Sequence, residues 1–290
     1  MNNRASLTAE YMALFRALES LRPASARLFA DPYAAIFLRE WRKWLYRAAR
    51  LPVGLRFAEK LLDRGAPGAR AAGIARTKWI DDEATSALDT AAQLVLLGAG
   101  FDMRAHRLAA AARATVFELD HPYTSSVKQS AVRNVAPLPR EHVRYVGIDF
   151  SRQSVSEVLV QAGFDRTQPA CFIWEGVTNY LTAEAIDSTF HRIRQTASGN
   201  ILLFTYIDRA VLDAPEQFFG AAKLMARLQR YGEPWTFGWR PAELPPYLAA
   251  RGFEVVKDLS VAEVWRGTGR STAGTRGYEF YRLATAAWRG

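Results

Sequence analysis

The sequence predicts an α/β fold in which helices flank a mainly parallel sheet, and residues 93–122, QLVLLGAGFDMRAHRLAAAARATVFELDHP, carry the prediction. The apolar run Leu94–Leu97 has the pattern of a strand that is buried on both faces. Gly98-Ala99-Gly100 then allows the backbone to turn sharply and to approach a ligand closely. A helical pattern over Met103–Ala112 and a second apolar strand, Thr115–Leu119, complete a Rossmann-like βαβ unit.

The acid after the second strand and the spacing of the glycines indicate which nucleotide fits. Asp120 follows the turn by about twenty residues, where a carboxylate accepts hydrogen bonds from a ribose. A dinucleotide fingerprint would have a third glycine at Met103, and Asp102 would repel a pyrophosphate at the start of the helix. S-adenosylmethionine (SAM) has a ribose and no phosphate, so the segment favours SAM over NAD. On this segment alone, a doubly wound domain with only a tight first turn remains the alternative.

Several motifs taken together resemble one protein family. LLGAGFDMRAHRL and VFELDHP, with ARTKWIDD before the first strand, GIDF at 147–150 and EGVTNYLTAEAI at 175–186, resemble the leucine carboxyl methyltransferase family of SAM-dependent O-methyltransferases. The resemblance covers roughly residues 70–206 and, more loosely, YMALFRALES and LFADPYA. It implies a class I methyltransferase fold with a seven-stranded sheet, and SAM as the cofactor. It also implies kinship with bacterial enzymes of secondary metabolism that esterify small-molecule acids.

The resemblance further implies roles for Arg76 and Lys78. In the family, the arginine at this position meets the methionyl carboxylate of SAM, which suits the fork of a guanidinium group. Lys78 would assist Arg76 or contact the substrate. Without the family, these residues favour an exposed helix face with ion pairs inside the helix. Asp81-Asp82 is expected to be an ordinary surface feature, and no Cys or His pair has the spacing of metal ligands.

Further candidates follow the third predicted strand, Val143–Ile148. Ligands of open α/β sheets lie beyond the carboxyl ends of the strands, so Asp149 and Phe150 are well placed. Asp149 can accept a hydrogen bond from the adenine amino group, and Phe150 can cover a face of the ring. Capping of the next helix, which is expected to start near Ser151, is the alternative role for Asp149.

Glu175 and Tyr180 follow the fourth predicted strand, Cys171–Trp174. By analogy with class I methyltransferases, residues here lie near the reactive methyl group. Glu175 would bind the amino group of SAM or balance its sulfonium, and Tyr180 would shape the opening for methyl transfer. Core packing or capping is the alternative for both, and no residue receives a certain catalytic role.

The chain divides into a helical N-terminal part and a sheet-forming core. We expect a cap or lid over residues 1–80 and a SAM-binding core over residues 81–290. Asp31-Pro32 is expected to start a helix that runs to about Arg50. Pro and Gly residues over 52–68 then predict an irregular link within the cap. In the core, residues 208–240 predict a helical insertion after the fifth strand that would cap the substrate. A last strand over Tyr278–Leu283 would complete the seven-stranded sheet with an antiparallel hairpin at its edge.

Composition limits the location and the partners. The single cysteine, Cys171, allows no intrachain disulfide, and neither a secretory signal nor a membrane span is apparent, so a cytoplasmic location is expected. The net charge is +9. Residues 39–50, REWRKWLYRAAR, combine tryptophans and cations at helical spacing. They read as a partly solvated helix, a substrate-binding lid or a basic helix on a membrane surface.

The implied reaction is methyl transfer to a carboxylate of a small acidic metabolite, giving a methyl ester. A carboxylate is ionised at neutral pH and needs no general base, so the protein must align the reactants and exclude water. A phenol or other hydroxyl acceptor is the alternative, and it would need a base such as His106, His121, His142 or His191. A nucleic-acid-binding protein with a basic surface is the alternative of another class, although the aromatic and basic signature of RNA-binding sheets is missing. The oligomeric state is left open.

Overall fold

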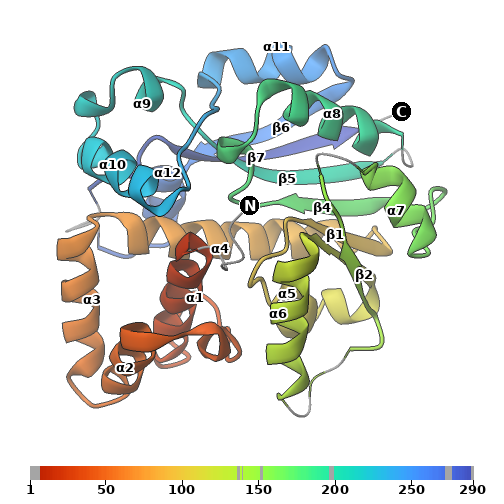
Figure 1. Cartoon of the computed structure of the whole chain (residues 1–290). Coiled ribbons are helices and arrows are strands. Elements are labelled where there is room, and N and C mark those ends of the chain that lie inside the picture. The colour runs from red at the N-terminus through yellow and green to blue at the C-terminus, as the bar shows by residue number, and fades with distance from the viewer. Residues whose placement is uncertain are drawn as a thin grey trace.

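The computed structural model describes residues 7–135, 138, 140–150, 153–195, 199–271 and 276–288. They form a seven-stranded sheet with helices on both faces (Figure 1), in the strand order β3-β2-β1-β4-β5-β7-β6. The strands are β1 (Gln93–Leu97), β2 (Thr115–Asp120), β3 (Val143–Gly147), β4 (Ala170–Trp174), β5 (Asn200–Ile207), β6 (Phe253–Ser260) and β7 (Tyr281–Trp288). The predicted α/β fold with an antiparallel hairpin at one edge is therefore confirmed.

The first five strands run parallel, and the chain changes direction across the sheet between β1 and β4. Both of these central strands are buried at every position, as their uninterrupted apolar sequences predict. Because parallel strands end at the same edge, the segments that follow β1, β2, β3 and β4 meet along one side of the sheet. The reversal of strand order places a crevice for ligands at the centre of that edge.

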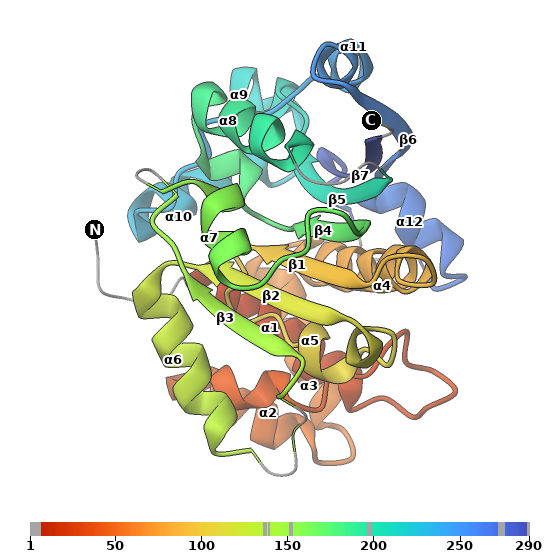
Figure 2. The same cartoon turned by 90° about the vertical axis from the view of Figure 1, so that its right-hand side faces the viewer.

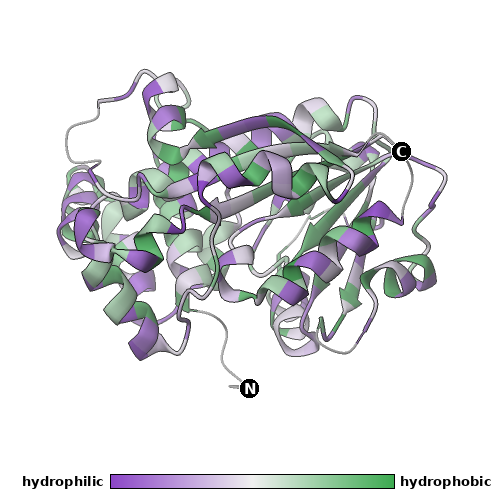
Figure 3. Cartoon of the chain, turned by 90° about the horizontal axis from the view of Figure 1, so that it is seen from above, coloured by the Kyte–Doolittle hydropathy of each residue, from purple (hydrophilic) through white to green (hydrophobic). Residues whose placement is uncertain are grey.

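Two layers of helices cover the sheet (Figure 2). Their members are α4 (Ala69–Ala87) and α12 (Val261–Gly267) on one face, and α7 (Val155–Gln161), α8 (Ala183–Arg194) and α11 (Leu244–Ala249) on the other. Leu94 and Leu96 of β1 enter the first core, whereas Val95 and Leu97 enter the second, as the alternation of side chains along a strand requires. Seen from above (Figure 3), hydrophilic and hydrophobic residues alternate along the helices, as is typical of amphipathic helices.

The N-terminal helices pack around a core of their own below α4 in Figure 1. They are α1 (Leu7–Ser20), the short 3₁₀ segment η1 (Ala34–Phe37), α2 (Glu40–Ala49) and α3 (Gly54–Gly65). Phe101, next to the glycine turn, belongs to this core and stacks on Phe37 at 4.4 Å between ring centroids. The N-terminal helices therefore rest directly on the βαβ unit. α4 runs through position 80, so one helix serves both parts of the chain.

Two predictions about helices were wrong in the N-terminal part. Residues 52–68 contain the helix α3 where we expected an irregular link. Gly54 and Gly65 stand at the two ends of this helix, so the interior has no helix breaker. The helix expected from Asp31 to Arg50 is divided into η1 and α2, and Glu40 has a positive φ of 51° where the second part begins.

The core also departs from prediction at three places. The helix expected over Met103–Ala112 is reduced to one turn, α5 (Arg104–Arg107), followed by the 3₁₀ segment η2 (Ala111–Arg113). The helix α6 (Pro122–Arg133) follows β2. α12 was not predicted. β7 starts at Tyr281, three residues later than predicted, because Tyr278 lies in a turn with φ 64° and accepts a hydrogen bond from the Tyr281 amide.

The segment after β5 is helical, as expected for an insertion. It contains α9 (Ala210–Asp213), the 3₁₀ segment η4 (Pro215–Gln217) and α10 (Ala221–Tyr231). The Nη2 atom of Arg227 in α10 donates to the Gly65 carbonyl at the end of α3, at 2.9 Å. The insertion therefore contacts the N-terminal helices directly.

Candidate active site

Most of the predicted SAM-binding residues lie at the carboxyl ends of the parallel strands. Residues 98–100 follow β1, Asp120 ends β2, Asp149 lies two positions beyond β3, and Glu175 directly follows β4. Since β1 pairs with both β2 and β4, the glycine turn lies between Asp120 and Glu175. The structure thus brings together side chains from four separate parts of the sequence.

The backbone of the glycine turn has a conformation that would be strained with any other residue type. Gly98 and Gly100 have φ values of 71° and 48°, in the left-handed region. A Cβ atom on Gly98 would lie 2.8 Å from Cγ2 of Val177. The amides of Gly98 and Ala99 both donate to the carbonyl of Leu119, at 2.9 and 3.0 Å. The turn is therefore folded back onto the end of β2.

Asp120 holds this turn in place from the neighbouring strand. Its Oδ2 atom accepts a hydrogen bond from the Gly100 amide, and its Oδ1 atom accepts one from the His121 amide at 2.6 Å. Burial raises the pKa of Asp120, while these two backbone hydrogen bonds oppose the rise. Each carboxylate oxygen has a second lone pair, so Asp120 can still accept from the hydroxyl groups of a ribose.

Arg76 reaches from α4 to the end of β4, where it meets Glu175. The Arg76 Nε atom lies 2.6 Å from Oε1 of Glu175, and its Nη1 atom donates to the Tyr281 hydroxyl at 2.9 Å. Beside this pair, the amide of Gly176 donates to the Oγ1 atom of Thr205 at 2.7 Å. Arg76, which we expected at the methionyl carboxylate, and Glu175, which we expected at the amino group or the sulfonium, are in direct contact.

Arg104 is the centre of the charged cluster, and the sequence analysis did not single it out. Its guanidinium group contacts the carboxylates of Asp81 (2.7 Å), Asp102 (2.6 Å) and Glu175 (2.5 Å). The residue is only 2% exposed. Burial by itself would lower the pKa of Arg104, but the carboxylates raise it well above its usual value. Such a buried cation depends on its paired carboxylates.

Asp81 is a correction to the sequence analysis, which placed it at the surface. It is buried, and its two carboxylate oxygens accept from Arg104 and also from Arg107 at 2.6 and 2.7 Å. Arg107 also pairs with the buried Asp31, and Asp31 pairs with Arg16 of α1. Arginines and carboxylates therefore alternate along one connected cluster, and Asp102 branches from it at Arg104. In order, the cluster consists of Arg76, Glu175, Arg104, Asp81, Arg107, Asp31 and Arg16.

Sequence reasoning had one usable signal for this cluster. Arg104 and Arg107 are three residues apart directly after the glycine turn, so they lie on one side of a helical turn. Their partners Asp81 and Asp31 come from α4 and from the segment before η1. No pattern in the sequence connects these segments, because the contacts arise only when the N-terminal helices pack on the sheet.

Asp102 also plays a different part from the one expected. Its carboxylate pairs with Arg104, and its backbone carbonyl accepts a hydrogen bond from Lys128. Burial would raise the pKa of Asp102, but the charges of Arg104 and Lys128 outweigh this effect and lower it. Because Arg104 compensates its negative charge, Asp102 repels a pyrophosphate less strongly than we expected from the sequence. The argument from the missing third glycine is unaffected.

The structure places Lys78 away from Arg76. Two residues along a helix correspond to a rotation of about 200°, so the two side chains leave α4 on opposite sides. The Lys78 Nζ atom binds the carboxylate of Asp82 at 2.5 Å, one turn further along. This is the pairing within a helix that the residues alone favoured.

Asp149 and Phe150 lie at the outer end of the site. The Asp149 amide donates to Oε1 of Gln153, and the Gln153 amide donates to the Asp149 carbonyl, both at 2.9 Å. α7 begins at Val155 with Ser154 in the N-cap position, so Asp149 does not cap this helix. The Phe150 side chain is exposed. Residues 151 and 152, where we expected the helix to begin, lie outside the described residues.

Tyr180 is one of three aromatic residues, with Trp235 and Tyr281, that lie next to the charged cluster. It ends the 3₁₀ segment η3 (Thr178–Tyr180), and burial raises the pKa of its hydroxyl. The Trp235 ring lies 6.3 Å from that of Tyr281, which itself holds Arg76. Rings from η3, from the segment after α10 and from β7 therefore enclose the side of the site that faces the insertion.

The N-terminus of α1 contacts the segment after α10 in the same region. Oε1 of Glu233 accepts from the Leu7 amide at 3.1 Å, and its Oε2 atom accepts from the Thr8 hydroxyl at 2.8 Å. Glu233 follows α10, and three residues later the Thr236 amide donates to the Asn179 carbonyl at 2.8 Å. Glu233 thus connects the first helix of the chain to the insertion.

Comparison with known proteins identifies the chain. A model of the family described as leucine carboxyl methyltransferase matches residues 9–194, which include the glycine turn and Glu175. The chain belongs to the leucine carboxyl methyltransferase family. It is a SAM-dependent methyltransferase, as the sequence motifs predicted, and this decides in favour of SAM over NAD.

Individual relatives agree with this family assignment. A protein of Mycolicibacterium smegmatis, provisionally named a SAM-dependent methyltransferase, is 31% identical over 278 residues, which cover 92% of this chain and 78% of that protein. A relative from Mycolicibacterium paratuberculosis with the same provisional name is 30% identical, covering 91% of this chain and 88% of that protein. A crystal structure from Thermobifida fusca superimposes with a TM-score of 0.62 at 16% identity, covering 99% of this chain and 96% of that one, and so shares the fold.

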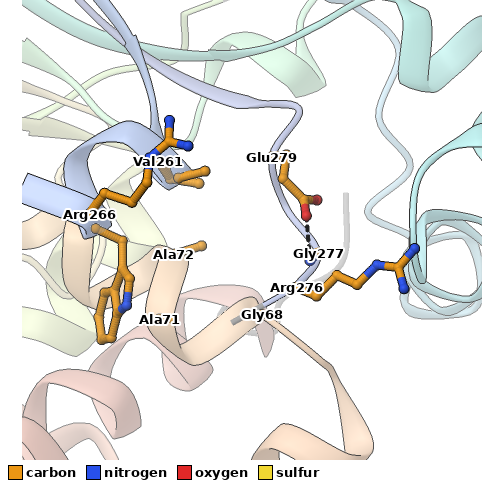
Figure 4. A pocket seen from close by; sticks show the side chains of 10 residues that line it. Gly68, Ala71, Ala72, Val261, Arg266, Arg276, Gly277 and Glu279 are labelled. Carbon is orange, nitrogen blue, oxygen red and sulfur yellow. Dashed lines mark hydrogen bonds between the residues drawn. The ribbon is translucent and has the colours of Figure 1, made fainter. Parts of the chain in front are cut away.

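One hollow of the methyltransferase lies apart from these residues (Figure 4). It has a volume of about 320 Å³ and lies between the start of α4, α12 and residues 276–279. Arg266, Arg276 and Glu279 line it, and Glu279 accepts a hydrogen bond from the Gly277 amide. None of the predicted SAM-binding residues lines this hollow.

Neither a group of three or more His, Cys, Asp or Glu side chains suited to a metal ion nor a helix long and apolar enough to cross a membrane occurs among the residues that the structure describes.

Proposed function

We propose that this methyltransferase transfers the methyl group of SAM to a carboxylate oxygen of a small acidic metabolite. The observation that supports a carboxylate acceptor is that all four histidines form hydrogen bonds with groups outside the charged cluster. His106 contacts the Tyr145 hydroxyl (3.0 Å), His142 the Ala105 carbonyl (2.7 Å) and His191 the side chain of Gln195 (3.0 Å).

His121, the least implausible base for a phenol, is engaged at the start of α6. Its Nδ1 atom accepts a hydrogen bond from the Tyr123 amide, so the imidazole caps the helix although Asp120 is its neighbour. A phenolic acceptor would need a base to take its proton, whereas a carboxylate arrives ionised. The arrangement therefore supports the carboxylate acceptor.

We assign the methionyl part of SAM to Arg76 and Glu175. SAM carries a carboxylate and an ammonium group on the same carbon, so Arg76 would pair with the first and Glu175 with the second. The contact between Arg76 and Glu175 supports this assignment, because a zwitterion that inserts here exchanges one ion pair for two. Arg104 would hold Glu175 in position from its other oxygen.

The remainder of SAM would follow the strand ends. Asp120 would accept from the ribose hydroxyls, and Gly98, Ala99 and Gly100 would allow the donor to approach the backbone. Asp149 would accept from the adenine amino group, with the exposed Phe150 ring over the base. Lys78 has no part in this arrangement, because it points to the other side of α4.

The reaction itself needs little from the protein beyond alignment. The acceptor oxygen attacks the methyl carbon in line with the sulfur, the C–O bond forms as the C–S bond breaks, and the sulfur keeps the electron pair as a neutral thioether. The residues around the site would exclude water and fix the two reactants. Tyr180 would line the opening through which the methyl group passes.

We further propose that residues 1–80 and the insertion 208–240 form the lid that selects the acceptor, and that residues 81–290 form the SAM-binding core. The contacts of Glu233 with Leu7 and Thr8 support the pairing of the two lid segments. A cytoplasmic location belongs to the same proposal, in keeping with the single, buried Cys171.

The acceptor can be tested by the alkali stability of the product. The enzyme is incubated with methyl-labelled SAM and a panel of carboxylic acids and phenols, and the product is then exposed to mild base. A methyl ester releases its label as methanol, whereas a phenolic ether keeps it. Label that survives hydrolysis would contradict the carboxylate acceptor and leave the SAM dependence intact.

A further inference from the structure

The outer surface of α2 and α3 exposes large apolar side chains in unusual density. Eleven large hydrophobic side chains are exposed among the described residues, and six of them fall between positions 41 and 61. The exposed fraction of the residue is 68% for Trp44, 77% for Val53 and 63% for Phe57. The α2–α3 apolar surface, as we call it, consists of Trp41, Trp44, Leu51, Val53, Phe57 and Leu61.

The spacing of these residues places them in two rows. Trp41 and Trp44 are three positions apart on α2, and Phe57 and Leu61 are four apart on α3, so each row follows one side of its helix. Val53, four positions before Phe57, is the N-cap residue of α3. Both rows lead to the turn between the helices. The other sides of the helices are buried in the N-terminal core, through Leu45 and Ala49 of α2 and Ala58 and Leu62 of α3. Figure 1 shows both helices at the outer edge of the molecule, away from the sheet.

Six exposed cations lie in the same segment, whereas the buried Arg42 pairs with Glu10. In the part of the chain that the structure describes, no ion pair involves any of six exposed residues, which are Lys43, Arg47, Arg50, Arg56, Lys60 and Arg64. Two of the three acids of α2 and α3 are bound by other elements, because Glu59 and Asp63 pair with Arg70, and Glu59 also with Arg22, whereas Glu40 is exposed. The segment therefore presents its positive charges outward around exposed tryptophan and phenylalanine.

We propose that the α2–α3 apolar surface docks the protein on an anionic lipid bilayer. Tryptophan and phenylalanine would enter the boundary between head groups and acyl chains, while the surrounding cations would pair with lipid phosphates. The Arg47 guanidinium lies 5.1 Å from the centre of the Trp44 ring, so a cation and an aromatic ring already lie side by side on this surface. This attachment would be peripheral, through two short helices that lie along the surface.

A second copy of the chain is a poorer occupant. A symmetric contact through this surface would bring six unpaired cations of one copy against the same six of the other, and like charges in contact repel. An anionic bilayer satisfies both features of the surface, since it accepts apolar rings and neutralises the cations.

Vesicle co-sedimentation of the full chain tests the proposal. The protein is mixed with vesicles of phosphatidylcholine alone, or of phosphatidylcholine with about 30% phosphatidylglycerol, at which polybasic segments are attracted measurably. We expect sedimentation with the anionic vesicles only, and weaker binding at about 0.5 M salt, where surface charges are screened. The variants Trp44→Ser with Phe57→Ser, and Lys43→Glu with Lys60→Glu, should each reduce the bound fraction by about tenfold or more.

Val160→Ser and Val256→Ser are the matched controls, because both valines are exposed on other elements. The melting temperature and the Kd for SAM should stay at the wild-type values in every variant, which shows that each is folded. No sedimentation with anionic vesicles would overturn the proposal. Equal loss in the valine controls would do so as well. Light scattering tests for a second copy of the chain on this surface. A dimer that dissociates on Trp44→Ser, together with no binding to vesicles, would also overturn the proposal and would assign the surface to a second copy.

Discussion

Arg76 and Glu175 form an ion pair at 2.6 Å, although one lies on the helix before β1 and the other follows β4. Each side chain is about nine-tenths shielded from solvent, with 13% and 14% of its surface exposed. The pair is not isolated, because Arg104 binds the second oxygen of Glu175 and leads into the row of alternating charges. A methionyl group that binds between Arg76 and Glu175 therefore enters a site whose charges are already balanced.

Replacement of Arg76 should weaken SAM binding far more than replacement of Lys78. Arg76→Ala removes a charged hydrogen-bond donor to the methionyl carboxylate, and we expect a loss of about 1.5–3 kcal/mol, or roughly 10- to 100-fold in Kd. Lys78→Ala is the matched control on the same helix, since Lys78 points to the other side and pairs with Asp82. Calorimetric titration with SAM measures both. Equal effects of the two substitutions would remove Arg76 from the site.

Asp120→Ala should also weaken SAM binding, by about 1.4–3 kcal/mol, because a ribose loses its carboxylate acceptor. The same change frees the amides of Gly100 and His121, so the melting temperature must be measured beside the affinity. Asp89→Ala, at an exposed position near the end of α4, serves as the control. An unchanged affinity for SAM in Asp120→Ala would refute the ribose assignment.

Arg104→Ala should destabilise the whole protein. Removal of this buried cation leaves the carboxylates of Asp81, Asp102 and Glu175 without their shared partner, and breaking a buried ion pair costs about 3–5 kcal/mol. Urea unfolding measures the free energy directly. Arg113→Ala removes an arginine whose side chain is exposed, and it should change the stability by less than about 0.5 kcal/mol. Similar values for the two variants would show that the cluster contributes little to stability.

Glu118 should make the stability depend on pH. Burial raises its pKa from 4.5 to about 7, although the ammonium group of Lys128, 2.7 Å away, lowers it. Between these two pH values the folded protein binds more protons than the unfolded chain, so the free energy of unfolding falls as the pH rises. The contribution of Glu118 is present in full below pH 4.5 and is lost by about pH 7.

The measurement is urea unfolding of the wild type and Glu118→Gln at several pH values between 4.5 and 7.5, over which range the glutamine side chain does not titrate. The wild type should lose up to about 3 kcal/mol relative to the variant as the pH rises. Glu216→Gln, at an exposed position after α9, is the control and should follow the wild type. Parallel curves for wild type and Glu118→Gln would exclude a raised pKa.

Glu233→Ala should loosen the lid while the SAM site stays intact. The substitution removes the contacts of Glu233 with the Leu7 amide and the Thr8 hydroxyl, which hold α1 to the insertion. We expect faster hydrogen exchange over residues 7–20 and a higher KM for the acceptor, with the Kd for SAM unchanged. Glu216→Ala, in the same insertion and exposed, is the control. Unaltered exchange in α1 would show that Glu233 does not fasten the lid.

Local patterns were sufficient for much of the nucleotide-binding half. The apolar runs of β1, β2 and β4 and the glycines at 98 and 100 specify their conformations through burial and backbone sterics, and both effects act within a few residues. Errors concentrated where local signals conflict with packing. The helix expected after the glycine turn shrank to one turn, and the glycines around α3 mark its two ends.

The sequence by itself determined the sheet, the edge at which SAM is expected and the family to which the enzyme belongs. Tertiary structure alone decided which charges lie inside. Asp81 and Arg104 appear in the sequence as ordinary polar residues, and Lys78 as a companion of Arg76, until α4 packs on the sheet. Packing buries one side of α4 and leaves the other in water, and burial makes an unpaired charge so costly that only charges with partners stay inside.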